Sequence, residues 1–238
     1  MRVVGKSDVG MVRKQNQDAF WLEQLNEQTS IAVVCDGMGG VHGGQEASTL
    51  AISSLKESIS NMKPNDKPQK LIEQAIQLCN RVVYDEAQKR DELTGMGTTL
   101  VIALIKADKA YIGNVGDSRA YHITNGSISQ ITKDHSAVQE LVDSGHITER
   151  QAKIHPNKNV ITRAIGIDKE IEYDFFEVSV STDDILLLCS DGLSNYVDEN
   201  EIQFEASGGE FDDLAIRLID LANNRGGTDN ITVTAIQA

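Results

Sequence analysis

The 238-residue sequence has few cysteines, few aromatic residues and few basic residues. The three cysteines, Cys35, Cys79 and Cys189, are an odd and sparse set, so we expect no disulfide framework and a reducing cytoplasmic environment. Aromatic residues make up only 5% of the chain, which predicts an aliphatic core. Lys and Arg number 22 against 36 Asp and Glu, a net charge of −14. That balance argues against nucleic acid or an anionic membrane as a partner.

Long hydrophobic runs are also missing from the sequence. No stretch approaches the roughly 20 apolar residues of a membrane span, and the first ten residues, MRVVGKSDVG, lack the apolar core of a signal peptide. No internal repeat or low-complexity tract divides the chain. We therefore expect a cytoplasmic protein with a single domain over residues 1–238.

Apolar spacing predicts two long helices early in the chain and a third near its end. The first covers roughly Gly44–Met62 and the second roughly Pro68–Arg90, with Pro68 suited to a first helical turn. The segment Lys63–Lys67 is expected to connect them. The third helix covers roughly Asp212–Asn223.

Strand patterns lie on both sides of the first two helices and outnumber them. Asn125-Gly126 is a strong two-residue hairpin signal between two of these patterns. Hairpins and amphipathic helices together predict an antiparallel α+β layered fold, whose number of layers the periodicity does not give. The predicted strands are Ala19–Leu25, Ser30–Cys35, Thr98–Lys106, Lys109–Val115, Ala120–Thr124, Ser127–Thr132, Glu172–Val178, Ile185–Cys189 and Asn230–Ile236.

The least regular region is residues 134–166. It contains two short helical patterns, Ala137–Val142 and Thr148–Ala152, followed by HPNKN. A mobile flap and an ordinary surface loop explain this pattern equally well.

Four aspartates lie near glycines at predicted strand ends: Asp36, Asp117, Asp191 and Asp229. A strand end supports a carboxylate rigidly, and a nearby glycine lets the backbone approach a ligand. Converging carboxylates repel one another unless a cation binds them, and oxygen ligands suit hard divalent cations. One such aspartate usually marks a turn, whereas four make a metal site as good an explanation as turns.

The segment Arg13–Asp18, with sequence RKQNQD, adds a cation and a further carboxylate. An arginine side chain can bind phosphate through two parallel hydrogen bonds. Taken alone, this segment is more typical of a solvated surface loop.

Eight short motifs occur in an order that spans nearly the whole chain. Together they resemble the PPM/PP2C family of metal-dependent protein phosphatases in its compact bacterial form. The motifs are RKxNQD at Arg13–Asp18, VCDGMGG at Val34–Gly40, GMGTTL at Gly95–Leu100, GNVGDSRAY at Gly113–Tyr121, DHS at Asp134–Ser136, TRAIG at Thr162–Gly166, LCSDGL at Leu188–Leu193 and GGTDNIT at Gly226–Thr232.

This resemblance implies a four-layer α-β-β-α sandwich of two stacked antiparallel sheets flanked by helix pairs. It also implies Mn²⁺ or Mg²⁺ as the cofactor, with two core ions and a third, weaker one. The implied substrates are phosphoserine and phosphothreonine proteins, and the implied partners are a bacterial serine/threonine kinase and its targets.

The resemblance assigns the core metal site by position in the motifs. Asp36 would bridge two ions, the carbonyl of Gly37 would bind one of them, and Asp191 and Asp229 would bind the other. Asp18 would orient a water molecule from behind these ligands.

It also assigns two residues at the edge of that site. Arg13 would hold the substrate phosphate, and Asp117 would support the third ion together with Asp191. Animal members carry histidine after Asp-Gly as a proposed general acid, but this chain has Met38 there. The proton donor therefore stays open between His42 and a metal-bound water.

Two further interpretations and one local alternative remain. The chain could be a non-catalytic phosphoprotein-binding domain, although Asp36, Asp191 and Asp229 are all present. It could instead belong to the sporulation and stress-response branch, acting on one regulatory protein.

Cys35 and Cys189 border two of the aspartate motifs, but neighbouring strand residues face opposite ways, so we expect core cysteines and not zinc ligands.

Overall fold

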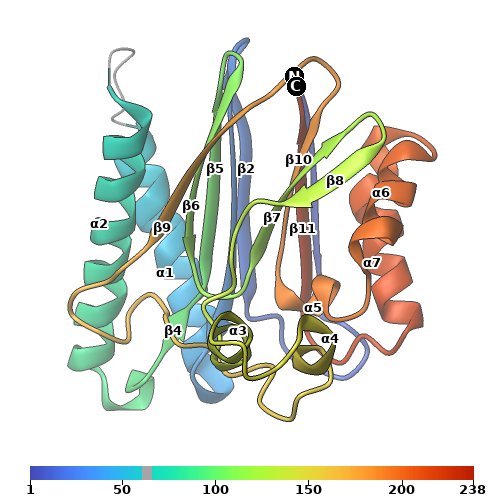
Figure 1. Cartoon of the computed structure of the whole chain (residues 1–238). Helices are drawn as coiled ribbons and strands as arrows, with labels where there is room; N and C mark the ends of the chain where they lie inside the picture. Colours follow the sequence, from blue (N-terminus) through green and yellow to red (C-terminus); the bar gives the residue numbers. More distant parts are fainter. Residues whose placement is uncertain (61–65) are drawn as a thin grey trace.

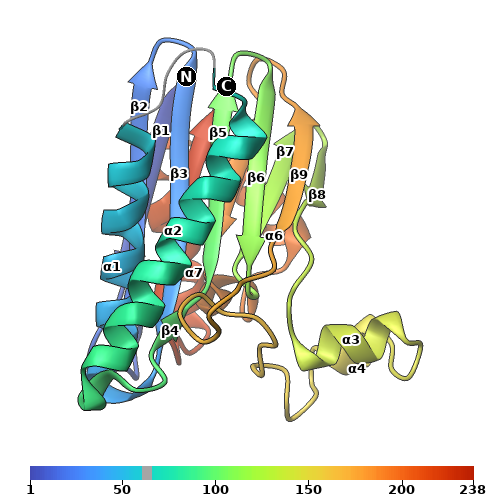
Figure 2. The same cartoon turned by 90° about the vertical axis from the view of Figure 1, so that its left-hand side faces the viewer.

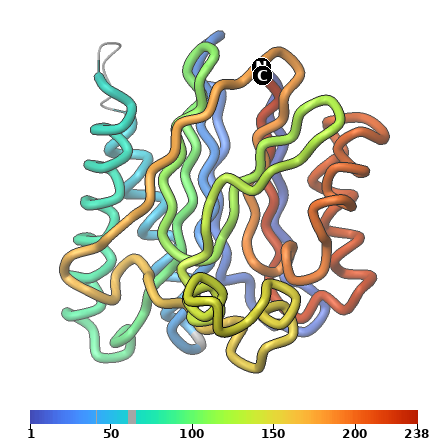
Figure 3. Tube along the Cα trace, viewed as in Figure 1, coloured from blue at the N-terminus to red at the C-terminus, as the bar shows by residue number. Residues whose placement is uncertain are grey.

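The computed structural model describes residues 1–60 and 66–238. Two antiparallel sheets lie face to face, and a pair of helices covers the outer face of each sheet (Figure 1). The antiparallel α+β class and the four layers predicted from the sequence are confirmed. Both termini lie side by side at one end of the sandwich (Figure 3), because Arg2 in the first strand pairs with Gln237 in the last.

The strands form one sheet of five and one of six. In the first sheet the order is β1 (Arg2–Asp8), β11 (Ile231–Gln237), β10 (Ile185–Cys189), β7 (Arg119–Thr124) and β8 (Ser127–Gln130). In the second sheet the order is β2 (Asp18–Asn26), β3 (Thr29–Met38), β5 (Leu100–Lys106), β6 (Lys109–Val115) and β9 (Asp174–Ser179), with β4 (Gly97–Thr98) paired to the end of β3.

The long helices flank the sheets, and short ones lie near one end of the sandwich. The described helices are α1 (Gly40–Ser60), α2 (Pro68–Lys89), α3 (Ala137–Asp143), α4 (Glu149–Ala152), α5 (Asp191–Ser194), α6 (Glu199–Ser207) and α7 (Leu214–Asn224), with 3₁₀ turns at Asp91–Leu93 and Phe211–Asp213. Helices α1 and α2 cover the second sheet, and α6 and α7 cover the first (Figure 1). No helix in the described part of the chain is long and apolar enough to cross a membrane.

The core consists of three apolar layers, which explains the continuous hydrophobic runs in the central strands. In β3, Ile31 and Val33 pack toward α1 and α2, whereas Ala32 and Val34 pack between the two sheets. A strand that is buried on both faces needs apolar residues at every position. The predicted aliphatic core is confirmed.

Several predicted boundaries were wrong by a few residues. Helix α1 begins at Gly40, four residues before the expected Gly44, and its first two turns contain three glycines despite the low helix propensity of glycine. Strand β8 ends at Gln130 and not at Thr132. Met62, the predicted end of the first helix, lies outside the described residues, as does most of the expected connection Lys63–Lys67.

The sequence reading missed β1 and α6. Strand β1 has charged residues and a glycine in place of a strong hydrophobic alternation, and it becomes an edge strand by pairing with β11 over its full length. Helix α6 begins with a capping box formed by Asp198 and Glu201, a signal that the sequence does contain.

The segment of residues 134–166 carries α3 and α4 and projects from the sandwich (Figure 2). Its two helices begin close to the predicted positions, and the side chains of Ser136 and Thr148 cap their first turns. Whether this segment moves as a flap stays a prediction.

Candidate metal centre

All four predicted aspartates line one cavity with a volume of about 690 Å³. Helix α5, which begins with one of them, lies at one end of the sandwich (Figure 1). Asp36 lies near the end of β3, Asp191 opens α5 directly after β10, Asp229 precedes β11, and Asp117 lies between β6 and β7. Strands from both sheets therefore deliver carboxylates that are far apart in the sequence to one place. Arg13 and Gly37 line the same cavity.

Backbone hydrogen bonds hold Asp36 firmly at the sheet end. Its N–H donates to the Thr99 hydroxyl at 2.9 Å, and its carbonyl accepts from the Thr98 hydroxyl and the Thr99 N–H, both at 2.9 Å. The two threonines belong to the motif GMGTTL, and sequence reasoning gave them no role. Their hydroxyls show why that motif accompanies the aspartate.

Asp18 connects the two sheets behind the cavity. It is the cross-strand partner of Asp36 in the second sheet, and one of its oxygens accepts from Ser190 at 2.8 Å and Thr232 at 2.7 Å in the first. Its other oxygen, Oδ1, is buried and has no hydrogen-bond partner in residues 1–60 and 66–238. Burial raises the pKa of Asp18 to about 7 against the hydrogen bonds from the two hydroxyls.

The carboxyl groups of the cavity disfavour one another's charge. Burial raises the pKa of Asp36 well above its usual range, and the charges of Asp18, Asp191, Asp117 and Asp229 add to the effect. Burial and Asp191 likewise raise the pKa of Asp117 to about 8. Such a group of carboxylates calls for compensating positive charge.

Asp229 and Asp191 each accept a hydrogen bond from a polar side chain. The Arg13 guanidinium donates to Asp229 at 2.7 Å, and this ion pair raises the pKa of Arg13. The side-chain amide of Asn195 donates to Asp191 at 3.0 Å, within one turn of α5. The ion pair was not predicted, because nothing in the sequence brings Arg13 to Asp229.

Residue 37 has no room for a side chain. A Cβ there would lie 2.0 Å from the carbonyl oxygen of Gly44 and 2.6 Å from that of Gln17. The close approach of three backbone segments explains the glycine and leaves its carbonyl as the group this residue can offer to a ligand.

The donor set fits a divalent cation by its chemistry. In the described part of the chain, no three acidic, histidine or cysteine side chains already converge on one point, so binding would draw the carboxylates together. Carboxylate and carbonyl oxygens are the ligands that Mg²⁺ and Mn²⁺ prefer. The unpartnered Oδ1 of Asp18 and the mutual repulsion of the aspartates are what such a cation would relieve.

The loop of Asp117 is tied to the start of the 134–166 segment. Arg119 donates two hydrogen bonds, of 2.9 and 2.7 Å, to the carboxylate of Asp134. The Gly116 N–H donates to Nδ1 of His135 at 3.1 Å. His135 is buried, so its ring supports this loop from within the protein.

Some sequence candidates lie apart from the cavity. His42 is exposed in the first turn of α1 and is not among the residues that line the cavity, so its role as proton donor stays untested. Cys35 and Cys189 are fully buried in two different apolar layers, as expected for core cysteines.

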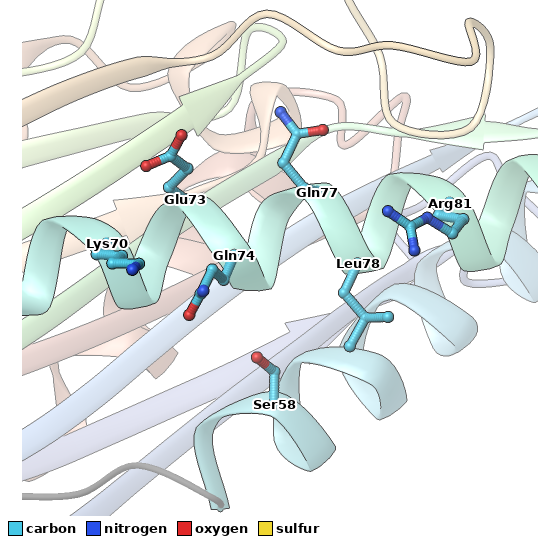
Figure 4. A pocket seen from close by; sticks show the side chains of 7 residues that line it. All are labelled: Ser58, Lys70, Glu73, Gln74, Gln77, Leu78 and Arg81. Atoms are coloured by element: carbon cyan, nitrogen blue, oxygen red, sulfur yellow. The ribbon is translucent and has the colours of Figure 1, made fainter. Parts of the chain in front are cut away.

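A second cavity, of about 460 Å³, lies on the helical layer formed by α1 and α2. Ser58 of α1 and Leu78 of α2 line it together with mixed polar side chains such as Lys70, Glu73 and Arg81 (Figure 4). These side chains are spread along a helix and carry opposite charges, so they offer no convergent set of metal ligands.

Comparison with known proteins places this geometry in a family. The family model for protein phosphatase 2C matches residues 11–231. A serine/threonine phosphatase from Listeria monocytogenes is 37% identical over 98% of this chain and 94% of its own length. The crystal structure of the phosphatase Stp1 from Staphylococcus aureus superposes with a TM-score of 0.93 at 36% identity, covering 99% of this chain and 94% of that one.

A further solved structure bears on the cavity. It shows the catalytic domain of the serine/threonine protein phosphatase PstP in complex with two manganese ions, with a TM-score of 0.87 and 34% identity over 98% of this chain and 96% of that one. With the matched family model, these full-length similarities identify the chain as a member of the protein phosphatase 2C family.

Proposed function

We propose that this phosphatase hydrolyses phosphoserine and phosphothreonine esters in proteins with Mn²⁺ or Mg²⁺ bound in the aspartate cavity. The observation that carries the proposal is that four carboxylates and one arginine line a single cavity of a chain whose net charge is −14. An anionic substrate needs a local reversal of that charge. Bound divalent cations supply it, and they also lower the pKa of water and screen the phosphate.

The chain's own residues have separable tasks in this proposal. Asp36 is close enough to the other acidic groups for each of them to raise its pKa, and it would bridge two core ions. The Gly37 carbonyl would bind on one side, and Asp191 and Asp229 on the other. Asp18 would orient the attacking water from behind, since its Oδ1 has no hydrogen-bond partner among the described residues.

The remaining site assignments concern the substrate side of the cavity. Arg13 would transfer from Asp229 to the phosphate oxygens, because a guanidinium that already faces the cavity can pair with either anion. Asp117 would support a third, weaker ion with Asp191. His42 stays a candidate proton donor for the leaving oxygen.

The cellular setting follows from the same proposal. The substrates would be phosphoproteins modified by a bacterial serine/threonine kinase, and the protein would act in the cytoplasm opposite that kinase. The 134–166 segment, tied to the Asp117 loop through Arg119 and Asp134, would act as a flap over the substrate side.

Phosphate release from a phosphothreonine peptide tests the proposal. Protein freed of metal by a chelator should release no phosphate, and added Mn²⁺ should restore release. A rate that is unaffected by the chelator would contradict metal-dependent hydrolysis. Binding of the phosphopeptide without hydrolysis under any metal would favour the non-catalytic alternative, and strict selectivity within a phosphoprotein panel would favour the regulatory branch.

Arg13→Ala should act mainly on substrate binding. We expect the KM for a phosphopeptide to rise about tenfold with a smaller fall in kcat, since the lost contact already exists in the ground state. Lys14→Ala is the matched control, because Lys14 lines the same cavity and its substitution also removes one positive charge. Equal KM values for Arg13→Ala and wild type would show that Arg13 does not hold the phosphate.

A further inference from the structure

The side-chain amide of Asn230 makes three hydrogen bonds to the backbone of one distant loop. Its Oδ1 accepts from the Gln17 N–H at 2.8 Å, and its Nδ2 donates to the carbonyls of Val9 at 2.9 Å and Gln15 at 3.0 Å. Both amide hydrogens and the amide oxygen are therefore engaged, which fixes the orientation of the group. Asn230 is buried, with 5% of its surface exposed.

These bonds hold both ends of the loop that carries Arg13. Between the bonded groups, Met11 and Val12 are 68% and 64% exposed, so little side-chain packing restrains this stretch. One backbone bond, from the Met11 N–H to the Gly227 carbonyl at 2.7 Å, ties its middle to the segment that precedes Asp229.

The loop also packs directly on the backbone of Asp229. A Cβ at Gly10 would lie 2.1 Å from the Asp229 carbonyl oxygen, and Gly10 has a φ of +78°, where glycine is favoured. Asp229 also accepts a hydrogen bond from the Arg13 guanidinium. The loop therefore contacts the residues before β11 in three ways: through the backbone packing at Gly10, through the Arg13–Asp229 ion pair and through the Asn230 amide.

We propose that Asn230 is a positioning residue for phosphate binding, because its amide keeps residues 9–17 in the conformation that aims Arg13 into the cavity. The inference rests on the proposed role of Arg13. Without the amide, three backbone groups lose their partners. Side-chain bonds from Asn16 to Ser7 and from Gln17 to Gly40 would still hold the end of the loop that leads into β2, but the exposed stretch around Arg13 would be freed to sample positions away from the cavity.

Asn80 provides a matched control within the same chain. Its Oδ1 accepts from the Gly166 N–H at 2.8 Å, and its Nδ2 donates to the carbonyls of Asp168 at 2.9 Å and Lys169 at 3.3 Å. It is 1% exposed and does not line the aspartate cavity. Asn80→Ala therefore removes the same kind and number of bonds from a different loop.

Limited trypsin digestion of the full chain tests the proposal without using activity. Cleavage after Arg13 or Lys14, followed by mass spectrometry, reports opening of the loop. We expect Asn230→Ala to accelerate that cleavage about tenfold and Asn80→Ala to leave it unchanged, because only the first variant frees this loop. If Asn230→Ala fails to fold, Asn230→Asp keeps the acceptor for Gln17 and should still show faster cleavage than wild type.

Steady-state kinetics supply the second readout. Asn230→Ala should raise the phosphopeptide KM by about tenfold while kcat changes by less than about threefold. Equal cleavage in the two variants, or a normal KM in Asn230→Ala beside a raised KM in Arg13→Ala, would overturn the inference. An unchanged KM in Arg13→Ala beside faster cleavage in Asn230→Ala would instead sink the proposed role of Arg13, so the two failures can be told apart.

Discussion

Asp36→Asn is expected to lower kcat on a phosphothreonine peptide by roughly a thousandfold or more, about 4 kcal/mol in activation free energy. Asp36 lines the cavity near the end of β3, where burial and the charges of Asp18, Asp191, Asp117 and Asp229 raise its pKa. The substitution keeps the shape of the side chain and removes its charge. Folding should persist, because the change relieves repulsion among buried carboxylates.

Asp184→Asn serves as the control for losing a buried carboxylate outside the site. Asp184 accepts from the Ser181 N–H at 2.8 Å and contacts His122 at 2.9 Å, at the opposite end of β10 from Asp191. We expect a lower Tm with a nearly normal kcat for Asp184→Asn, and the opposite pattern for Asp36→Asn. An Asp36→Asn protein within tenfold of wild-type activity would refute the assignment of Asp36.

Asp117→Ala is expected to separate two kinds of substrate. Hydrolysis of a phosphopeptide should fall strongly, because a serine or threonine oxygen needs a proton as it leaves. Hydrolysis of p-nitrophenyl phosphate should fall less, since its phenolate leaves without one. Asp117 is 8% exposed and lines the cavity from the loop between β6 and β7, where the proposed third ion would bind.

The competing explanation is that Asp117 only stabilises its turn. Asp134→Asn tests this, because it weakens the Arg119 contact that stiffens the same loop and leaves the cavity carboxylates in place. Loss of loop rigidity alone would lower Tm and both activities together in either variant. Parallel losses in Asp117→Ala with a lowered Tm would count against a role in leaving-group departure.

The central strands and the acidic motifs are visible in the sequence for one physical reason. Strands β3 and β10 are buried on both faces, so they read as unbroken apolar runs, and Asp36 and Asp191 follow those runs closely. A carboxylate directly after a buried strand lies at the end of the sheet, because the strand itself is enclosed by apolar side chains. From the residues alone a metal site was as good an explanation of these aspartates as turns, and the family resemblance favoured the site. The antiparallel class was predicted separately, from the hairpin signal and the amphipathic helices.

Long-range polar contacts could not be predicted in the same way. The Arg13–Asp229 pair and the bonds from Asn230 to residues 9–17 join segments more than 200 positions apart, and no local periodicity encodes such pairing. Strand β1 was missed for a related reason, because its stability comes from pairing with β11 and not from its own pattern. The number of layers came from family resemblance and not from periodicity.

Equilibrium dialysis with Mn²⁺, on wild-type protein and on Asp36→Asn, tests most directly whether the aspartate cavity binds the cations. Wild-type protein should retain about two tightly bound ions per chain, as expected for a two-metal hydrolase site. Asp36→Asn should lose tight binding while keeping its far-ultraviolet circular dichroism spectrum. Unchanged tight binding of Mn²⁺ by folded Asp36→Asn would place the metal elsewhere and contradict the assignment of the cavity as the metal site.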